Sequence, residues 1–203
     1  MSTDWSVVKW YSSGMKYDAQ TTRQSILTAA AAEFAQYGIA GARVDRIARA
    51  ANCSKAMIYA YYTSKDLLFD AVFDALVVCN MHDVPIDARD LPEYAARLLE
   101  QHQKRPEALR LATWDRLERG ARGMNIRAVV EAREHKVAEI RKAQQEGAVS
   151  DHFPADTLLE LILALTQTSP TFPEGAATDE ELGKHRQAVK DAVNGLSNQR
   201  SGV

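Results

Sequence analysis

The stretch "VDRIARAANCSKAMIYAYYTSKDLL", residues 44–68, decides the fold of the N-terminal part of this chain. Two short segments with helical apolar spacing flank Asn52 and Cys53, which break the pattern. Ser54 follows them, and its hydroxyl can cap a new helix. Asn52 stands where a tight turn needs a positive φ, which asparagine tolerates better than most residues. The pattern predicts a helix-turn-helix.

The second helix of such a motif can enter the major groove of DNA, and the local charge favours that function. Between Gly41 and Lys65 there are five basic residues and one acidic residue, Asp45, for a net charge of +4. The whole chain has a formal net charge of −2, so positive charge is concentrated where phosphates would lie. The alternative is a small hydrophobic hairpin with solvated ends.

Composition places the chain among ordinary globular proteins. Its composition, 46% hydrophobic and 26% charged, is typical of that class. A length of 203 residues is enough for one domain or for a small domain joined to a larger one. A sequence pI of about 6.2 argues against indiscriminate binding of nucleic acid over the whole surface, but it allows one basic patch.

The remaining composition predicts a cytoplasmic protein. Two cysteines without framework spacing are typical of a reducing compartment. No apolar run approaches the roughly 20 residues that span a bilayer. The first fifteen residues carry polar side chains throughout, so no signal peptide is expected.

Helical periodicity recurs along the rest of the chain, and strand patterns are almost absent. The first helix is predicted over residues 21–38, with Ile26, Ala30, Phe34 and Tyr37 on one inward stripe and Gly38 at its end. Ser64 caps the helix that runs to about Asn80. A linker over residues 81–92 and a loop over residues 169–180 separate further helices at 92–103, 106–119, 125–146, 155–168 and 179–196. We expect an all-α protein with about nine helices.

The N-terminal third resembles the DNA-binding domain of TetR-type transcriptional regulators. That pattern runs Thr-Arg, an apolar helix ending Phe-x-x-x-Gly, Ile-Ala, Gly-Val-Ser, an apolar-Tyr pair, an aromatic residue and Ser-Lys-acid-Leu-Leu. The matching positions are Thr22, Arg23, Phe34, Gly38, Ile47, Ala48, Ser54, Ile58, Tyr59, Tyr62, Ser64, Lys65, Asp66, Leu67 and Leu68. Asn52 and Cys53 replace the usual Gly-Val, and Tyr62 replaces the commoner Phe. These departures are physically mild.

The resemblance implies two parts with different functions. The family couples its DNA-binding domain to a larger helical domain that dimerises and binds a small effector. We therefore expect a flexible N-terminal arm over residues 1–16, a helix-turn-helix DNA-binding domain over 17–63, a connecting helix over 64–80, and a C-terminal effector-binding and dimerisation domain over 81–203.

The resemblance also implies which residues contact DNA. Tyr59, Lys65 and Arg43 would contact phosphates, whereas the first turn of the second helix, with Tyr61 alongside, would face base edges and phosphates. The DNA-binding set is Arg43, Ser54, Lys55, Ala56, Met57, Tyr59, Tyr61 and Lys65. Tyr62 is expected in the core, and Arg46 and Arg49 on a solvated face.

Two helices of the C-terminal half are candidates for a dimer interface. The segment 154–168 is apolar on nearly every face, and the last helix carries Leu182, Val189 and Leu196 seven residues apart. Pairing with a second subunit would form a four-helix bundle, and the alternative is an intrachain pair over the same core. The candidate dimer residues are Leu158, Leu161, Ile162, Leu165, Leu182, Arg186, Val189, Val193 and Leu196. A dimer is favoured because a two-fold reader needs two recognition helices about one DNA turn apart.

The sequence also offers candidate residues for an effector pocket. Aromatic, leucine and methionine side chains at helical spacing form the candidate set, although such a stripe is more often plain core. The candidate pocket residues are Phe73, Leu76, Tyr94, Leu98, Leu111, Trp114, Leu117 and Met124. Glu131 and His135 share a helix face, which is at most half a metal site.

Together these patterns predict a homodimeric repressor that releases a palindromic DNA operator when a small-molecule effector binds. No catalytic motif is found, so no enzyme activity, cofactor or metal is expected. The alternative from another class is an all-α ligand-binding or scaffold protein without DNA-binding activity. The effector, the operator, the regulated genes and the sign of regulation are not determined by these patterns.

Overall fold

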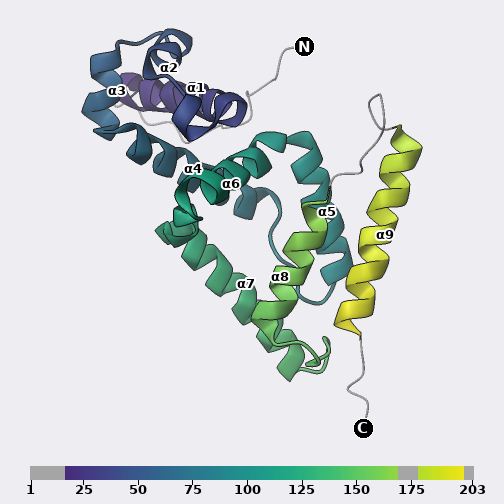
Figure 1. Cartoon of the computed structure of the whole chain (residues 1–203). Coiled ribbons are helices and arrows are strands. Elements are labelled where there is room, and N and C mark those ends of the chain that lie inside the picture. The colour runs from purple at the N-terminus through teal and green to yellow at the C-terminus, as the bar shows by residue number, and fades with distance from the viewer. Residues whose placement is uncertain (1–16, 169–177, 199–203) are drawn as a thin grey trace. The chain divides into compact units, whose positions relative to one another are not determined.

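The computed structural model describes residues 17–168 and 178–198 of the chain. Within these ranges it contains nine α-helices and one 3₁₀ turn, and no strand (Figure 1). In chain order they are α1 (Tyr17–Gly41), α2 (Val44–Ala50), α3 (Lys55–Tyr62), α4 (Lys65–Asp83), α5 (Leu91–Lys104), α6 (Pro106–Arg119), η1 (Arg122–Asn125), α7 (Arg127–Gln145), α8 (Ala155–Thr166) and α9 (Asp179–Ser197). The expected all-α fold class is confirmed. The expected arm over residues 1–16 and most of the loop over 169–180 lie outside the described residues.

The chain forms two compact units. Unit 1 contains α1 to α3, α4 as far as Cys79, α6 and η1; unit 2 contains α5, α8, α9 and most of α7. Residues 107–129 therefore belong to the same unit as the N-terminal helices, although they lie within the range expected to form the C-terminal domain. The boundaries of the expected functional domains stay a prediction.

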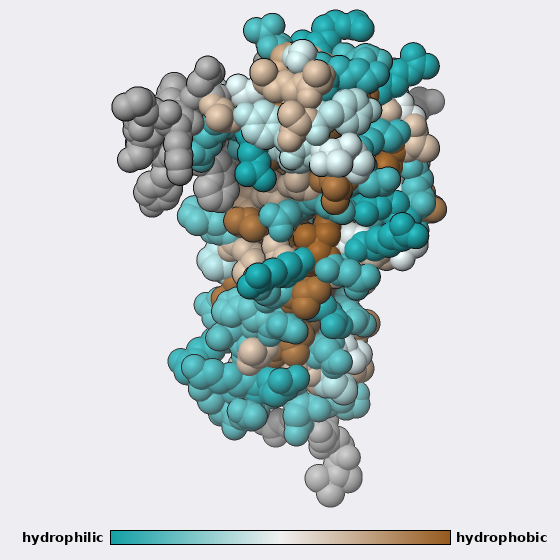
Figure 2. Space-filling view, turned by 90° about the vertical axis from the view of Figure 1, so that its left-hand side faces the viewer, coloured by the Kyte–Doolittle hydropathy of each residue, from teal (hydrophilic) through white to brown (hydrophobic). Residues whose placement is uncertain are grey.

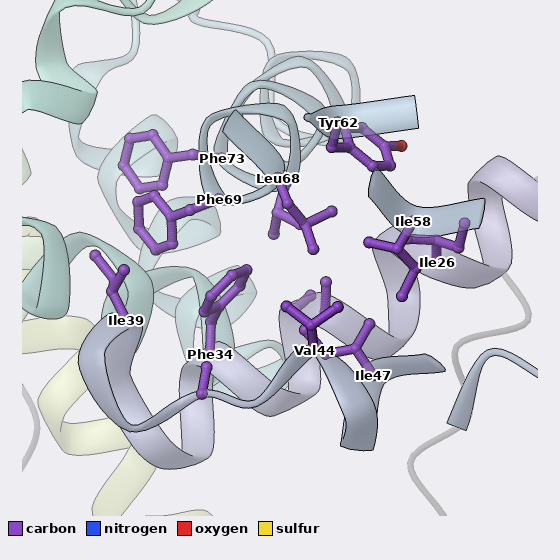
Figure 3. Close-up of a cluster of buried hydrophobic side chains, with 14 of the residues drawn as sticks. Ile26, Phe34, Ile39, Val44, Ile47, Ile58, Tyr62, Leu68, Phe69 and Phe73 are labelled. Atoms are coloured by element: carbon purple, nitrogen blue, oxygen red, sulfur yellow. The ribbon is translucent and has the colours of Figure 1, made fainter. Parts of the chain in front are cut away.

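Unit 1 is built on a buried apolar core (Figure 3). Phe34 of α1 meets Phe69 of α4 edge-on, with ring centroids 5.3 Å apart, and Phe69 stacks on Phe73 at 5.9 Å. Ile58 of α3 lies beside Ile26 of α1 in the same cluster. Burial of each such side chain stabilises the fold by about 1.5–3 kcal/mol. This core fixes the positions of α2 and α3 on α1.

The end of α1 is held by α6, which explains why α6 belongs to unit 1. The backbone changes direction at Gly38, where φ is 71°, a value that glycine adopts without strain. Beyond it, the Ala40 N–H donates to Glu118 Oε2 at 2.6 Å. The indole N–H of Trp114 donates to the Ala35 carbonyl at 3.4 Å. The first straight helix therefore ends at Gly38, as the sequence predicted, and a short helical segment follows the kink as far as Gly41.

The turn between α2 and α3 has the geometry expected from the sequence. Asn52 has φ 52°, in the left-handed region. The Met57 N–H donates to Ser54 Oγ at 3.1 Å, and the Leu67 N–H donates to Ser64 Oγ at 3.1 Å. Both predicted helix caps are confirmed, so the start of α3 and the start of α4 each have a side-chain acceptor.

One residue of the predicted inward stripe of α1 is not buried. Tyr37 is exposed, and the guanidinium of Arg46 lies 4.1 Å from the centre of its ring. Ile26, Ala30 and Phe34 are buried as expected. Helical spacing placed Tyr37 inward, but the described neighbour over its ring is the Arg46 guanidinium rather than an apolar core.

Unit 2 packs α5 against α8 and α9 (Figure 1). Its core includes Tyr94 and Leu98 of α5, which are fully buried or nearly so. Ion pairs join α9 to α5: Arg186 lies 2.7 Å from Glu93 and 2.6 Å from Glu100. These half-buried charges fix α9 along α5 in addition to the apolar contacts.

The described helices are not of a kind that spans membranes. None combines the length and the apolar composition needed to cross a bilayer within residues 17–168 and 178–198. Hydrophilic residues cover most of the face shown in Figure 2, with smaller groups of hydrophobic residues between them.

The turn geometry predicts how Asn52 tolerates substitution. Asn52→Ala should lower the free energy of unfolding by about 1 kcal/mol, because a Cβ without a polar group disfavours the left-handed region. Asn52→Gly should leave stability unchanged or raise it, since glycine adopts this φ freely. Thermal unfolding followed by circular dichroism measures both. Equal melting temperatures for the two variants would contradict the assigned turn.

Candidate nucleic-acid interface

The surface of α3 presents most of the residues expected to contact DNA. Ile58 and Tyr62, four residues apart, point into the core of unit 1. Met57, Tyr59 and Tyr61 are 41%, 42% and 40% exposed, unusually high values for large side chains. Lys55 and Ala56 are exposed in the first turn. The structure therefore brings five of the eight expected DNA contacts onto one exposed helix surface.

Lys55 is the cation of this surface and it has an acidic neighbour. Its Nζ lies 3.0 Å from Asp45 Oδ1 of α2, and both side chains are exposed. The hydrogen bond to Asp45 raises the pKa of Lys55, so the lysine is charged at neutral pH. A phosphate or base approaching Lys55 would compete with Asp45. Sequence reasoning counted Asp45 only as one negative charge.

Tyr61 and Ser54 border the same surface. The Tyr61 hydroxyl donates to the Ala19 carbonyl at 3.4 Å, a long bond that partly orients the ring. Ser54 accepts the Met57 N–H, which leaves its own O–H able to donate to a phosphate or a base. Tyr62 is buried as expected, and the Arg23 guanidinium donates to its hydroxyl at 3.4 Å.

Glu33 positions the start of α2. Its Oε1 accepts the Arg43 N–H at 2.8 Å and the Arg46 Nε–H at 2.7 Å. Arg46 also donates to the Gly41 carbonyl at 3.0 Å. Arg46 is therefore a half-buried, ion-paired residue, whereas the sequence predicted a solvated one. Arg43 presents an exposed guanidinium at the N-terminus of α2, as its expected role requires.

Lys65 has an internal contact that the sequence did not indicate. Its Nζ donates to the Ala40 carbonyl at 3.0 Å and to the Ala42 carbonyl at 3.1 Å. These bonds join the first turn of α4 to the end of α1. An ammonium group has three donors, so one N–H remains for a phosphate. Lys65 can thus hold the backbone and contact DNA at the same time.

The residues expected to line one effector pocket are not brought together within either unit. Phe73 and Leu111 belong to the core of unit 1, whereas Tyr94 belongs to the core of unit 2. Leu117 and Met124 are 71% and 48% exposed, so the structure does not support a lining role for them. Six residues turn a helix by about 600°, which places Leu117 roughly 120° away from Leu111. The same separation applies to the rest of the set: Leu76 and Trp114 pack in unit 1, and Leu98 in unit 2.

Several residues expected at a dimer interface are buried within the chain itself. Leu158, Ile162, Val189 and Val193 lie in the core of unit 2. Arg186 forms ion pairs with α5. For the four buried residues the structure corrects the expectation in favour of the intrachain alternative, whereas the half-buried Arg186 stays a prediction. Spacing revealed an apolar stripe on α9, but only the fold shows that α5 covers it. Leu161, Leu165, Leu182 and Leu196 are half-buried.

Two family models match the chain. The model described as "Bacterial regulatory proteins, tetR family" matches residues 26–72. The model described as "Tetracyclin repressor-like, C-terminal domain" matches residues 90–194. The first range contains the helix-turn-helix, and the second covers about half of the chain.

The chain is also similar to individual transcriptional regulators in sequence and in structure. HTH-type transcriptional repressor SCO4008 of Streptomyces coelicolor is 40% identical over 160 residues, which are 77% of this chain and 82% of that protein. HTH-type transcriptional repressor NicS of Pseudomonas putida is 30% identical over 55% of this chain and 57% of its own length. The crystal structure of SCO4942 from Streptomyces coelicolor has a TM-score of 0.75 at 34% identity, covering 88% of this chain and 99% of that one. Salmonella enterica GusR, at 17% identity, shares the fold with a TM-score of 0.72 over 91% of this chain and 100% of that one.

The internal contacts of Lys65 predict a role in stability that needs no DNA. Lys65→Met should lower the free energy of unfolding by about 1 kcal/mol, because two carbonyls at the end of α1 lose a charged donor. The melting temperature should fall by about 2–4 °C for a chain of this size. Lys55→Met is the matched control, since its exposed ion pair contributes little. An unchanged melting temperature for Lys65→Met would show that the two bonds do not stabilise unit 1.

Proposed function

The chain belongs to the TetR family of DNA-binding transcriptional regulators, and we propose that it acts as a homodimeric repressor that leaves a palindromic operator when a small-molecule effector binds. Its location would be the cytoplasm, where chromosomal operators lie, and its role would be regulatory rather than catalytic. No cofactor is required by this proposal.

One observation carries the proposal that α3 reads DNA. The eight residues of α3 are anchored in the core of unit 1 by Ile58 and Tyr62, and Ser54 caps the helix. Its exposed surface presents a lysine and two tyrosines to solvent. Proteins rarely leave large aromatic side chains exposed together without a partner. Residues 41–65 carry a formal net charge of +4, and this charge together with the exposed hydroxyls suits the phosphates and base edges of a major groove.

The exposed residues would have two kinds of role. Tyr59, Arg43 and Lys65 would donate to phosphates, which fixes the position of α3 but carries no sequence information. Lys55 and Met57, at the N-terminal end of α3, would reach base edges, because recognition helices enter the groove by their first turns. Phosphate contacts and base contacts respond differently to mutation.

Substitution of Lys55 and Tyr59 tests this division. Lys55→Ala should cost about 1–3 kcal/mol on the operator and relax its sequence preference. Tyr59→Phe should weaken binding to all sequences alike, since it removes only a hydroxyl donor to phosphate. Fluorescence anisotropy with DNA flanking the gene, compared with scrambled DNA over a range of salt concentrations, measures both effects.

The same titrations decide between the regulator and a scaffold protein. Wild-type protein that fails to bind its flanking DNA at low salt would contradict the proposed function. Asp45→Asn is an informative partner variant, because it frees Lys55 while leaving every other α3 residue in place. It should tighten binding. Weaker binding by Asp45→Asn would show that Lys55 does not reach the DNA.

We propose that the second subunit packs against α8 and α9. These helices run antiparallel: His185 contacts the Thr168 carbonyl near one end, and the Ser150 N–H donates to the Ser197 carbonyl near the other. On α9 the side chains of Ala188 and Ala192 are exposed, and Gly195 has open space around it. Such small residues allow a second helix pair to approach closely.

The partly exposed leucines of the two helices would complete this surface. Leu161 and Leu165 of α8, with Leu182 and Leu196 of α9, remain half-buried in a single chain. A copy of the same chain is the occupant that we propose, because a two-fold operator requires two α3 helices in one complex.

Ala192→Arg tests the dimer surface. The arginine should convert the dimer to a monomer, because a second α9 could no longer approach, and binding to a two-half-site operator should fall at least about tenfold. Gln187→Arg, on another exposed side of α9, is the control. Light scattering after gel filtration gives the mass, and unfolding curves verify the fold. A dimer that persists in Ala192→Arg would place the interface elsewhere.

We further propose that α4 transmits effector binding to α3. The helix leads from Lys65, which is bonded to the end of α1, into the residues of unit 2. An effector that favours a different position of α4 would change the separation of the two α3 helices in the dimer, and the operator would be released.

A further inference from the structure

A lysine occupies a core-facing position of α7 in unit 2. Ala132, Ile140 and Ala143 are buried on one side of this helix, and Lys136 lies on the same side, four residues after Ala132 and four before Ile140. Apolar residues are expected at such positions. Burial lowers the pKa of Lys136, because the charged ammonium is partly removed from water. No carboxylate of the described residues forms an ion pair with it.

A tyrosine hydroxyl without a partner faces the same interior. Tyr94 of α5 is 0% exposed, and the Lys136 ammonium lies 6.0 Å from the centre of its ring. The Tyr94 Oη is fully buried and has no hydrogen-bond partner in the described part of the chain. Burial raises the pKa of this phenol, so it stays protonated and is an O–H donor. A buried donor without an acceptor is costly and needs an explanation.

The turn of α5 that follows Tyr94 adds a further hydrogen-bond donor. Arg97 follows Tyr94 by three residues, and its Nε is buried without a partner in the described residues. The pKa of Glu93 is lowered chiefly by the hydrogen bond from Lys190, and the charge of Arg97 contributes last. Both oxygens of Glu93 already accept from other cations, Arg186 and Lys190. Glu93 is therefore committed to the contact between α5 and α9.

His102 limits the chemistry of the cluster. It lies two turns after Tyr94 on α5, and its Nδ1 is 3.0 Å from the Thr166 carbonyl. A carbonyl only accepts, so Nδ1 carries the hydrogen. Burial and the charge of Lys136 lower the pKa of His102, so the ring is neutral near pH 7. Lys136, Tyr94, Arg97 and His102 therefore form a cluster of donors and neutral groups, and no unpaired anion of the described residues belongs to it.

We propose that the interior of unit 2 between α5 and α7 binds a small organic carboxylate, whose anionic group accepts from Tyr94 and Lys136 and whose apolar body packs among the neighbouring aliphatic side chains. The identification of this ligand as the effector rests on the proposed function. Arg97 provides a further donor beside Tyr94. An inorganic anion is disfavoured because the surrounding core, including Leu98 and Ile140, is aliphatic. A cation is disfavoured because Lys136 would repel it.

Two isosteric probe series test the charge preference on the full-length protein without DNA. Benzoate, benzamide and benzamidine share a shape but carry negative, zero and positive charge, as do hexanoate, hexanamide and hexylamine approximately. We expect the two carboxylates at millimolar concentration to raise the melting temperature by several degrees, through preferential binding to the folded state, and the other four to leave it unchanged. Isothermal titration calorimetry then gives the dissociation constants.

Two variants connect the binding to the named residues. Tyr94→Phe and Lys136→Met should weaken carboxylate binding at least about tenfold, because each removes a donor to the anion. Without probe, Tyr94→Phe should melt about 2–4 °C higher than wild type, because it removes a buried hydroxyl that has no hydrogen-bond partner in the described residues. Lys142→Met, at an exposed position of the same helix, is the control and should bind like wild type.

The outcomes are separable from those of the proposed function. Absence of any carboxylate effect on wild type, equal binding of the amides, or unchanged binding by Lys136→Met would overturn the site. If a bound water instead satisfies the Tyr94 hydroxyl, Tyr94→Phe should melt at the same temperature as wild type, and no carboxylate should bind. That result would overturn the site. Operator binding is measured in separate samples, so a protein that binds DNA but no carboxylate keeps its regulatory function and loses only this site.

Discussion

The burial of one face of α3 is the interaction on which the proposed function depends. An isolated helix of eight residues is unstable in water, because the cost of nucleation is not recovered over so few hydrogen bonds. The helix forms because Ile58 and Tyr62 insert into the core around Phe34 and because Ser54 caps its start. The remaining residues of α3 are not needed for the core, so they are available for contact with a partner. The exposed tyrosines follow from this division between the two sides of one short helix.

Polar side chains from outside α3 set the position of the elements around it. Glu33 holds the start of α2, Lys65 joins α4 to the end of α1, and Glu118 binds the backbone of Ala40 after the change of direction at Gly38. All three bind main-chain groups that would otherwise lie exposed or unpaired near helix ends. Rigidity at these points matters for a DNA reader, because a small rotation of α2 and α3 changes which base edges can be reached. These bonds also connect α4 and α6 to the end of α1, on which α2 and α3 pack.

Unit 2 uses its charges differently. Glu93 and Glu100 of α5 pair with Arg186 and Lys190 of α9, whereas the Tyr94 hydroxyl has no hydrogen-bond partner in the described residues and Lys136 lies over the Tyr94 ring. A protein selected for stability alone would replace them with apolar side chains. Their retention in the interior is consistent with a binding role, which an exposed lysine or tyrosine would not indicate. Because α5 covers the apolar stripe of α9, the small residues Ala188 and Ala192 stay exposed, and there we propose that a second subunit packs.

The sequence by itself determined the helical class, the helix-turn-helix, the left-handed turn at Asn52 and the caps at Ser54 and Ser64, because these depend on spacing and on side chains that act within a few residues. It also placed Tyr62 in the core, and the family resemblance implied that Tyr59 and Tyr61 face outward. Only the tertiary structure decided what covers each apolar stripe: α5 covers the stripe of α9, whereas Leu117 is left exposed by the residues that the structure describes. The roles of Glu33 and Lys65, and the unpartnered Tyr94 beside Lys136, were likewise invisible, because they join residues from distant parts of the chain. Periodicity reports that a side of a helix is apolar or polar, but its partner is fixed only when the helices pack.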